Sequence, residues 1–276
     1  MEDFEEKFIS DKIFGIDDLD KPIYRIFPQW ALEEALRLKR ITLVPPSFWE
    51  DPYEVIESKI VITRTSKSTP YPQIFPGQGL PPIYAQSWSA TVDSDTLLRA
   101  YSRVVKDPRH GRNTCPGDEG VRVRSTPRKL ISALNRSVGD REKIATFIGE
   151  VHYLPQEELN QKIANDVNRI GPDIFKDPVN RAKLLMLKRN GFFHEDEVRI
   201  IAALTEHAPA SSPVFNARMD INSIFDEMTF DPRLESFEIT NRKREFQSWG
   251  YTGSFGESGL YQKTFLEVVI RMPEET

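Results

Sequence analysis

The 276-residue sequence contains a single cysteine, Cys115, and only four histidines. A lone thiol cannot form an internal disulfide, and a cysteine-based zinc site needs at least two thiolates in most cases. The histidines (His110, His152, His194, His207) lie too far apart in sequence to indicate a local metal-binding motif. We therefore expect a cytoplasmic protein without a bound metal.

Long hydrophobic runs are absent as well. No stretch approaches the roughly 18 consecutive apolar residues of a membrane span, and the N-terminus is acidic where a secretory signal would be basic and then apolar. The sequence also lacks the GxxxxGK phosphate-binding loop, the GxGxxG dinucleotide-binding turn, the HExxH zinc motif and the GxSxG nucleophile elbow. Membrane insertion, standard secretion and these enzyme classes are not indicated.

The composition that remains is typical of a folded protein, with 39% hydrophobic and 29% charged residues and a net charge of −5. The charge is uneven, because residues 1–20 hold eight acidic residues and two lysines, whereas residues 99–143 hold twelve basic and five acidic residues. We predict an acidic leader over residues 1–21 and a single domain over residues 22–276. The basic segment, residues 99–143, is either a solvated face or a surface for phosphates or an acidic partner.

Apolar spacing and turn residues predict interspersed strands and helices. Strands are expected over 23–27, 83–89, 144–153, 198–204 and 265–272, and helices over 29–40, 93–105, 156–169, 178–188 and 236–247. The order lacks the regular alternation of a dinucleotide-binding fold, so the sequence favours the α+β class.

Three groups of residues could form a site together: Arg25 on an early strand, Ser87 and Ser89 on a middle strand, and Glu195 and Glu197 after an Asn-Gly turn. The planar guanidinium of arginine suits a pyrophosphate. A serine hydroxyl can donate to a carboxylate and fix its rotamer, and two carboxylates at positions i and i+2 of a strand project from the same face. Taken singly, each group is more often structural than functional, but their order and placement favour a joint site.

These three groups, in this order, resemble the Arg, Ser-x-Ser, Glu-x-Glu signature of the ADP-ribosyltransferase superfamily, in its Arg-Ser-Glu branch. The chain is also similar, over about residues 22–272, to a bacterial family of uncharacterised proteins. The motifs that carry this second resemblance are Tyr24-Arg25, Asp51-Pro52-Tyr53-Glu54, Ser87-Trp88-Ser89, Lys188, Phe192 and Glu195-Asp196-Glu197-Val198-Arg199. The resemblance implies a pair of packed, mostly antiparallel β-sheets with flanking helices.

The resemblance further implies an NAD-dependent mono-ADP-ribosyltransferase inside a bacterial cell, acting as a toxin or a phage-defence effector. NAD would be its substrate, and a protein side chain or a nucleic acid would be the acceptor. Arg25 would hold the pyrophosphate or the nicotinamide-side ribose of NAD, with further contacts from Tyr24, Ser87 and Tyr101.

The resemblance makes Glu197 the catalytic carboxylate, supported by Ser87 or Ser89. Cleavage of the nicotinamide glycosidic bond develops positive charge on the ribose, which a carboxylate bonded to the 2-hydroxyl stabilises. Glu195 would orient or deprotonate the acceptor, and Phe192 or Phe193, at the preceding turn, would contact it.

Two other hypotheses remain open. A metal-dependent nuclease would use Glu195, Glu197 and either Asp51 or Glu54 to bind Mg²⁺. A non-enzymatic binding module would keep the fold, with a filled cleft and with Arg25 far from Glu197. Asp51 and Glu54 also fit a device that starts a turn or a helix.

Overall fold

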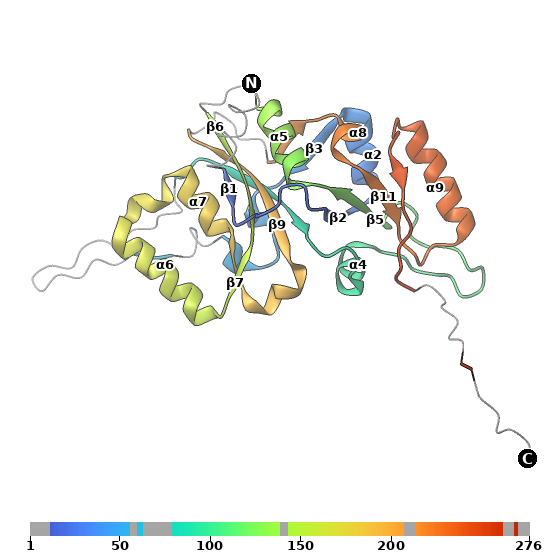
Figure 1. Cartoon of the computed structure of the whole chain (residues 1–276), viewed down its shortest axis with the longest axis horizontal. Coiled ribbons are helices and arrows are strands. Elements are labelled where there is room, and N and C mark those ends of the chain that lie inside the picture. Colours follow the sequence, from blue (N-terminus) through green and yellow to red (C-terminus); the bar gives the residue numbers. More distant parts are fainter. Residues whose placement is uncertain are drawn as a thin grey trace, which may run out of the picture.

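A computed structural model describes residues 12–55, 60–62, 79–138, 143–206, 213–261 and 268–269. The main feature is an eight-stranded sheet in the order β1-β6-β9-β4-β2-β5-β11-β12 (Figure 1). Neighbouring strands are antiparallel, except that β1 runs parallel to β6 and β12 runs parallel to β11. The strands are β1 (Ile13–Phe14), β2 (Ile23–Pro28), β4 (Ile83–Ser89), β5 (Gly120–Ser125), β6 (Ile144–Glu150), β9 (Glu197–Leu204), β11 (Glu227–Phe230) and β12 (Ser254–Phe255).

Helices and two small sheets surround this main sheet. Strand β3 (Arg40–Leu43) pairs with β10 (Phe215–Arg218), and β7 (His152–Leu154) pairs with β8 (Leu187–Arg189). The α-helices are α2 (Gln29–Leu38), α4 (Asp95–Tyr101), α5 (Pro127–Ser137), α6 (Gln156–Ile170), α7 (Pro178–Leu185), α8 (Ile221–Ile224) and α9 (Ser236–Ser248). The short 3-10 helices are η1 (Pro46–Phe48), η2 (Pro52–Glu54), η3 (Pro172–Phe175) and η4 (Asn190–Glu195).

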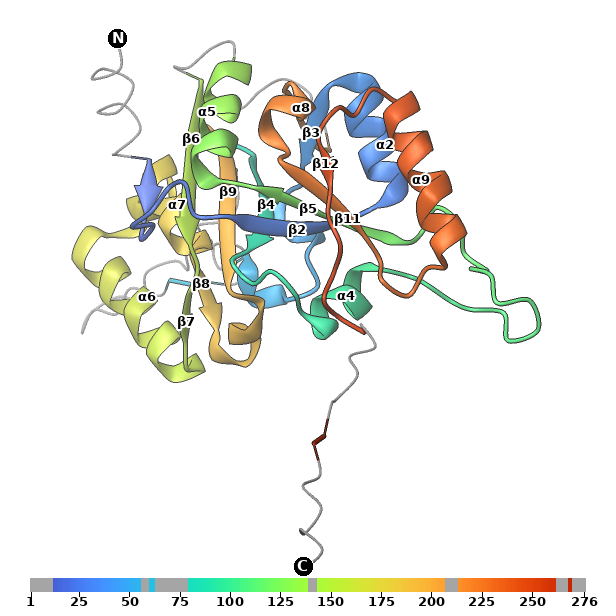
Figure 2. The ribbon, with the colours of Figure 1, turned by 45° about the vertical axis from the view of Figure 1, so that its right-hand side comes forward.

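The main sheet divides into two halves between β4 and β2. These strands share a single residue pair, Tyr24 with Ser89, whereas β4 is paired with β9 from Ile83 to Ser89. Helices α6 and α7 lie beside the β6-β9-β4 half, and α2 and α9 lie side by side next to the other half (Figure 1 and Figure 2). The predicted α+β class, with mostly antiparallel strands and flanking helices, is confirmed, and the two expected sheets are joined into one main sheet through the Tyr24–Ser89 pair.

Strand β9 is buried along nearly its whole length because both of its faces are covered. Ile200 and Ala202 belong to the main core, together with residues of α2, α5 and α8. Ile201 and Ala203 pack against α7. Since strand side chains alternate between faces, a strand that is covered on both sides is apolar at consecutive positions. This explains the continuous apolar run from 200 to 204.

The helices predicted over 29–40, 156–169 and 236–247 are confirmed to within a few residues, but three other predictions need correction. The helix expected over 178–188 ends at Leu185, and Lys188 lies on strand β8. The helix expected over 93–105 is the shorter α4, which begins after its cap, Ser94. Strand β1 lies within the predicted acidic leader, so residues 13–14 belong to the sheet.

Residues 1–11 of the predicted leader lie outside the described residues, as does most of the strand expected over 265–272. None of the described helices is both long enough and apolar enough to cross a membrane.

Candidate active site

The sheet face under α7 changes from apolar to polar along β4 and β9. Its apolar part packs against Ala182 and Leu185 of the helix and consists of Ile83, Ala85, Ile201 and Ala203. The next outward positions on the same face are polar, and the strand register places Ser87 opposite Arg199 and Ser89 opposite Glu197. Four polar side chains therefore gather at the end of the apolar layer.

Three of them, Ser87, Ser89 and Glu197, line a cleft of about 510 Å³ at the junction of the two sheet halves. Strand β2 supplies its residues from the other half. The predicted site residues that line the cleft are Tyr24, Arg25, Ser87, Ser89, Tyr101, Phe192, Glu195 and Glu197. Phe193 is the exception, because its side chain is 65% exposed and is not part of the cleft lining. An acceptor contact from Phe193 is therefore not supported by its position.

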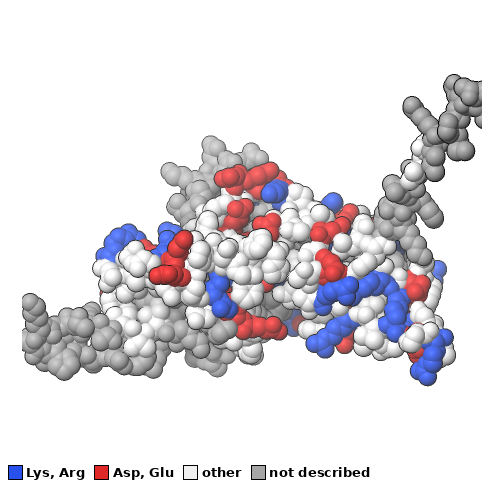
Figure 3. All heavy atoms as spheres, turned by 90° about the horizontal axis from the view of Figure 1, so that it is seen from below, with Lys and Arg blue, Asp and Glu red and all other residues white. Residues whose placement is uncertain are grey.

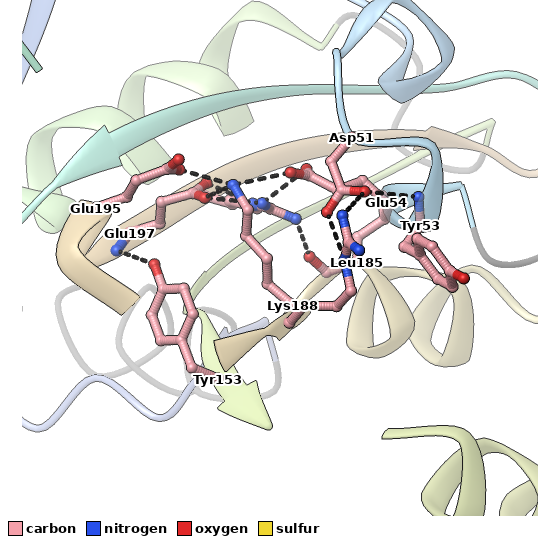
Figure 4. Close-up of polar contacts among 10 residues, drawn as sticks. Asp51, Tyr53, Glu54, Tyr153, Leu185, Lys188, Glu195 and Glu197 are labelled. Atoms are coloured by element: carbon pink, nitrogen blue, oxygen red, sulfur yellow. Dashed lines mark hydrogen bonds and ion pairs between the residues drawn. The ribbon is translucent and has the colours of Figure 1, made fainter. Parts of the chain in front are cut away.

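Two buried cations hold the Glu197 carboxylate at the first residue of β9 (Figure 4). Arg199 Nε donates to Oε2 at 2.8 Å, and Lys188 Nζ donates to Oε1 at 2.6 Å. Burial alone would raise the pKa of Glu197, but Arg199 and Lys188 outweigh it and hold the pKa well below its ordinary value. Glu197 is therefore a fixed, ionised carboxylate.

Glu195 has the opposite ionisation behaviour. Burial and the adjacent Glu197 carboxylate raise its pKa to about 7, although Lys188 Nζ, which donates to Glu195 at 2.6 Å, opposes the rise. The expectation that both glutamates lie on one strand is wrong, because Glu195 ends η4 and Asp196 adopts a left-handed conformation before β9 begins. The carboxylates nevertheless meet, since the same ammonium group binds both of them.

A third carboxylate, from Glu54 on η2, completes this cluster. Its two oxygens lie 2.8 Å from Lys188 Nζ and 2.8 Å from Arg199 Nη2. Burial would lower the pKa of Lys188, but Glu197 and Glu54 hold it above its ordinary value. With all groups ionised, the cluster holds two cations and three carboxylates, so a proton on Glu195 makes it neutral.

The site implied by the family resemblance gave no role to Glu54, Arg199 or Tyr153, and Glu54 was named only as a Mg²⁺ ligand of the nuclease hypothesis or as part of a turn. Glu54 and Arg199 stood in quoted motifs, but they are 145 residues apart and nothing local indicates that they pair. The Tyr153 hydroxyl accepts a hydrogen bond from the Glu197 backbone N–H at 2.9 Å and so fixes the start of β9 (Figure 4). No signal in the sequence connects Tyr153 to this strand.

Phe192 and the Asp51 turn form one wall of the cleft. The Phe192 ring lies 4.7 Å from Lys188 Nζ and 5.4 Å from the Arg189 guanidinium, distances typical of cation–π contacts. Asp51 caps η2 by accepting from Tyr53 N–H and also binds Arg189 at 2.7 Å. The interpretation of Asp51 as a turn-starting residue is confirmed.

The two serines differ in their surroundings. The Ser87 carbonyl accepts a hydrogen bond from Arg25 Nη1. Ser89 is buried, and its hydroxyl accepts from Thr91 N–H at 3.1 Å. In the described part of the structure, neither serine hydroxyl donates to Glu197, whose hydrogen bonds come from Lys188 and Arg199. Only Ser89 lies directly opposite Glu197 in the ladder.

Arg25 brings a permanent positive charge to the cleft. Burial lowers its pKa, while Tyr101 and the ionised Glu197 oppose this, and a guanidinium remains protonated under all ordinary conditions. Among the described residues, Arg25 Nε is a buried donor without a hydrogen-bond partner. Such an orphaned donor beside a cleft fits an anionic ligand group.

Seven of the twelve basic residues in the segment 99–143 form ion pairs with described residues, six of them with acidic residues from elsewhere in the described chain. Figure 3 shows Lys and Arg side chains gathered on the side where Figure 1 places α4, with Asp and Glu side chains next to them. Arg122 reaches the cleft lining. The ion pairs are Arg99–Asp95, Lys106–Glu235, Arg109–Asp107, Arg122–Asp93, Arg124–Glu227, Arg128–Asp20 and Lys129–Asp226.

The carboxylates named in the nuclease hypothesis already have cationic partners within the protein. The Lys188 ammonium occupies the point where Glu54, Glu195 and Glu197 converge. Asp51 points instead toward Arg189. No group of three or more potential metal ligands was found among the described residues. The geometry is that of carboxylates organised by protein cations.

Comparisons with known proteins give one structural likeness. No protein-family model matches the sequence, and no curated protein matches it. A solved structure of Thermus sp. 2.9 DarT, in complex with ADP-ribosylated ssDNA, matches with 11% identity and a TM-score of 0.32, over 88% of this chain and 95% of that chain. At this identity and TM-score, no residue role and no acceptor is transferred from DarT to this chain.

Proposed function

We propose that this chain is an NAD-dependent mono-ADP-ribosyltransferase. The observation that carries the proposal is the meeting, in one cleft, of Arg25, the two serines and the two glutamates from three strands and a turn. The cleft volume of about 510 Å³ lies within the usual range for small-molecule sites. The open cleft, lined by both Arg25 and Glu197, also favours an enzyme over a module with a filled cleft.

The residues of the cleft suit the chemistry of NAD. Arg25 supplies a cation with an unused buried donor for the pyrophosphate. Glu197 is held ionised by Arg199 and Lys188, and a fixed carboxylate stabilises the positive charge that develops on the ribose as nicotinamide leaves. Because the carboxylate is oriented before substrate arrives, little reorganisation is needed during the reaction.

Glu195 suits a role as the base toward the acceptor. A group with a pKa of about 7 is half deprotonated near neutral pH, where it can both accept a proton and release it. Glu195 lies beside Glu197 and near Phe192 in the cleft lining, so an acceptor nucleophile could approach both. The acceptor is proposed only as a macromolecule, either a protein side chain or a nucleic acid.

A label-transfer assay would test this function. Purified protein is incubated with NAD labelled in its adenylate part and with bacterial lysate, and macromolecular label is counted for wild type and Glu197→Gln. Loss of the charge at Glu197 should lower transfer by roughly 100-fold to 1,000-fold. Digestion of the product with protease or nuclease then identifies the class of acceptor.

The matched control is Glu119→Gln. Glu119 is also a fully buried glutamate paired with an arginine, Arg242, but it is not part of the cleft lining. This variant should transfer label like wild type if it is folded. Equal transfer by wild type and Glu197→Gln, or no transfer by folded wild type in lysates from several bacteria, would exclude the proposed activity.

The family resemblance supports a role in the bacterial cytoplasm as a toxin or a phage-defence effector. Induced expression of wild type should then arrest growth, and Glu197→Gln should not. Equal growth of the two strains at equal protein levels would contradict the toxin role without bearing on the transfer reaction.

A further inference from the structure

Glu54 belongs to none of the three groups that define the proposed active site, yet it contacts both cations that hold Glu197. Glu54 binds Lys188 and Arg199, each at 2.8 Å, and Glu197 binds the same two groups at 2.6 and 2.8 Å. The four side chains therefore form a closed ring in which carboxylates and cations alternate. All four are buried, with side-chain exposures of 0 to 6%.

The turn that carries Glu54 is itself fixed. Asp51 caps η2 at Tyr53 N–H and binds Arg189, whose guanidinium also lies 4.4 Å from the Tyr53 ring. The Arg199 guanidinium is held further by the Leu185 carbonyl and lies 4.6 Å from the Trp49 ring, at the end of the preceding turn. Glu54 thus reaches the cluster from a segment that is distant in sequence and is held in place by the contacts of Asp51, Tyr53 and Arg189.

We propose that Glu54 is a positioning residue for Glu197 and Glu195, acting through Lys188 and Arg199. This role rests on the proposed function, since it concerns the two glutamates that would act on NAD and the acceptor. The ring fixes both cations, the cations fix the Glu197 carboxylate, and the third negative charge favours retention of a proton on Glu195.

The surroundings of Glu195 allow this charge effect to be predicted. The ionisable groups around it are Lys188 on β8, Glu197 and Arg199 on β9, Glu54 on η2, Tyr153 on β7, Tyr101 on α4 and Arg25 on β2. Removing the Glu54 charge leaves two carboxylates for the two buried cations. Glu195 should then ionise at a lower pH, because Lys188 is freed to stabilise its charged form.

The first measurement follows the ionisation of Glu195 without using activity. The free energy of unfolding is measured by urea denaturation between about pH 5 and about pH 9 for wild type, Glu195→Gln, Glu54→Gln and the double variant. Folded Glu195 keeps its proton up to about pH 7, against an ordinary value of 4.5, so the folded state binds more protons in that interval. Its contribution to stability therefore falls as the pH rises through the interval.

The difference in free energy of unfolding between Glu195→Gln and wild type should accordingly grow with pH up to about pH 7 and then become constant. We call the pH at which this difference becomes constant the levelling pH. When the same comparison is made between Glu54→Gln and the double variant Glu54→Gln/Glu195→Gln, the levelling pH should be lower by about one pH unit or more. When both proteins carry Glu119→Gln instead, it should stay near pH 7, because Glu119 is paired elsewhere. The same levelling pH in the Glu54→Gln background would overturn the inference.

The second measurement uses label transfer. Glu54→Gln should lower kcat roughly 10-fold to 100-fold, as expected when a supporting partner of an active group is lost, with a smaller effect on the KM for NAD. Glu54→Asp keeps the charge with a side chain one methylene shorter, so kcat should fall while the levelling pH stays near 7. This variant also serves if Glu54→Gln does not fold.

The outcomes are distinguishable. A lowered levelling pH in Glu54→Gln together with wild-type kcat would overturn the positioning role. A lowered levelling pH in the Glu54→Gln background, combined with no label transfer by the folded wild type, would overturn the proposed function, while the charge coupling between Glu54 and Glu195 would be supported.

Discussion

At the scale of single residues, Glu195 and Glu197 lie two positions apart in sequence, yet their pKa values are shifted in opposite directions. Glu197 receives hydrogen bonds from Arg199 and Lys188, whereas Glu195 shares only Lys188 and lies against the charge of its neighbour. Two carboxyl groups with separated pKa values are typical of sites that divide electrostatic and acid–base work. Both residues are glutamates with the same intrinsic chemistry, so the difference in their pKa values comes from their surroundings.

The separated pKa values predict a pH profile. Label transfer by wild type should rise with pH to a plateau, with an apparent pKa of about 7, as Glu195 becomes available as a base. Glu195→Gln should show a low, nearly flat rate over the same range. Initial rates at saturating NAD between about pH 5.5 and about pH 9 would measure this. An unchanged rising limb in Glu195→Gln would show that another group titrates.

At the scale of secondary structure elements, the charged cluster combines residues of one long strand with residues of short elements. β9 supplies Glu197 and Arg199, but Glu54 comes from η2, and Lys188 from the short strand β8. Apolar periodicity predicts long elements such as β9 and α6 because their burial pattern repeats. It does not predict where a three-residue strand replaces the end of a helix, and for this reason the sequence predicts a helix that includes Lys188.

The role of η2 can be tested with a matched pair of caps. Asp51 and Asp177 each precede a proline, and each accepts a hydrogen bond from the backbone N–H two residues later. Asp51→Ala and Asp177→Ala should both lower the free energy of unfolding, by about 0.5–2 kcal/mol for loss of the cap. Asp51→Ala should lower the free energy of unfolding more than Asp177→Ala does, because it also removes the ion-pair partner of Arg189.

Only Asp51→Ala should lower label transfer, because only η2 carries Glu54 into the cluster. Urea denaturation and the transfer assay measure the two effects separately. A loss of transfer in Asp177→Ala as large as that in Asp51→Ala would indicate that general destabilisation, and not the placement of Glu54, is the cause.

At the scale of the whole molecule, the fold cancels the charge segregation of the sequence. The basic segment, residues 99–143, pairs with acidic residues that come from as far away as Asp20 and Glu235. The ion pairs in and next to this segment differ in burial. The Asp20 pair is exposed on both sides, whereas Asp231 is buried and binds both Arg233 and the Ser102 hydroxyl at the base of the segment between α4 and β5.

This difference predicts unequal stability effects. Asp231→Asn should lower the free energy of unfolding by about 1.5–3 kcal/mol, because the buried carboxylate loses the charge that binds Arg233 and the Ser102 hydroxyl. Asp20→Asn should change it by less than about 1 kcal/mol, since exposed pairs are screened by solvent. Urea denaturation of both variants at neutral pH tests the comparison, and equal effects would contradict it.

The sequence by itself determined the α+β class, the long buried strands and the three groups that line the cleft, because apolar periodicity and side-chain chemistry are local properties. It also predicted that Arg25, the serines and the glutamates lie in one site, and all of them line the same cleft. Only the tertiary structure decided which charges neutralise one another. The ring of Glu54, Lys188, Glu197 and Arg199 joins three segments, and the proton affinities of the glutamates depend on burial and on distances of a few ångströms, which no local pattern encodes.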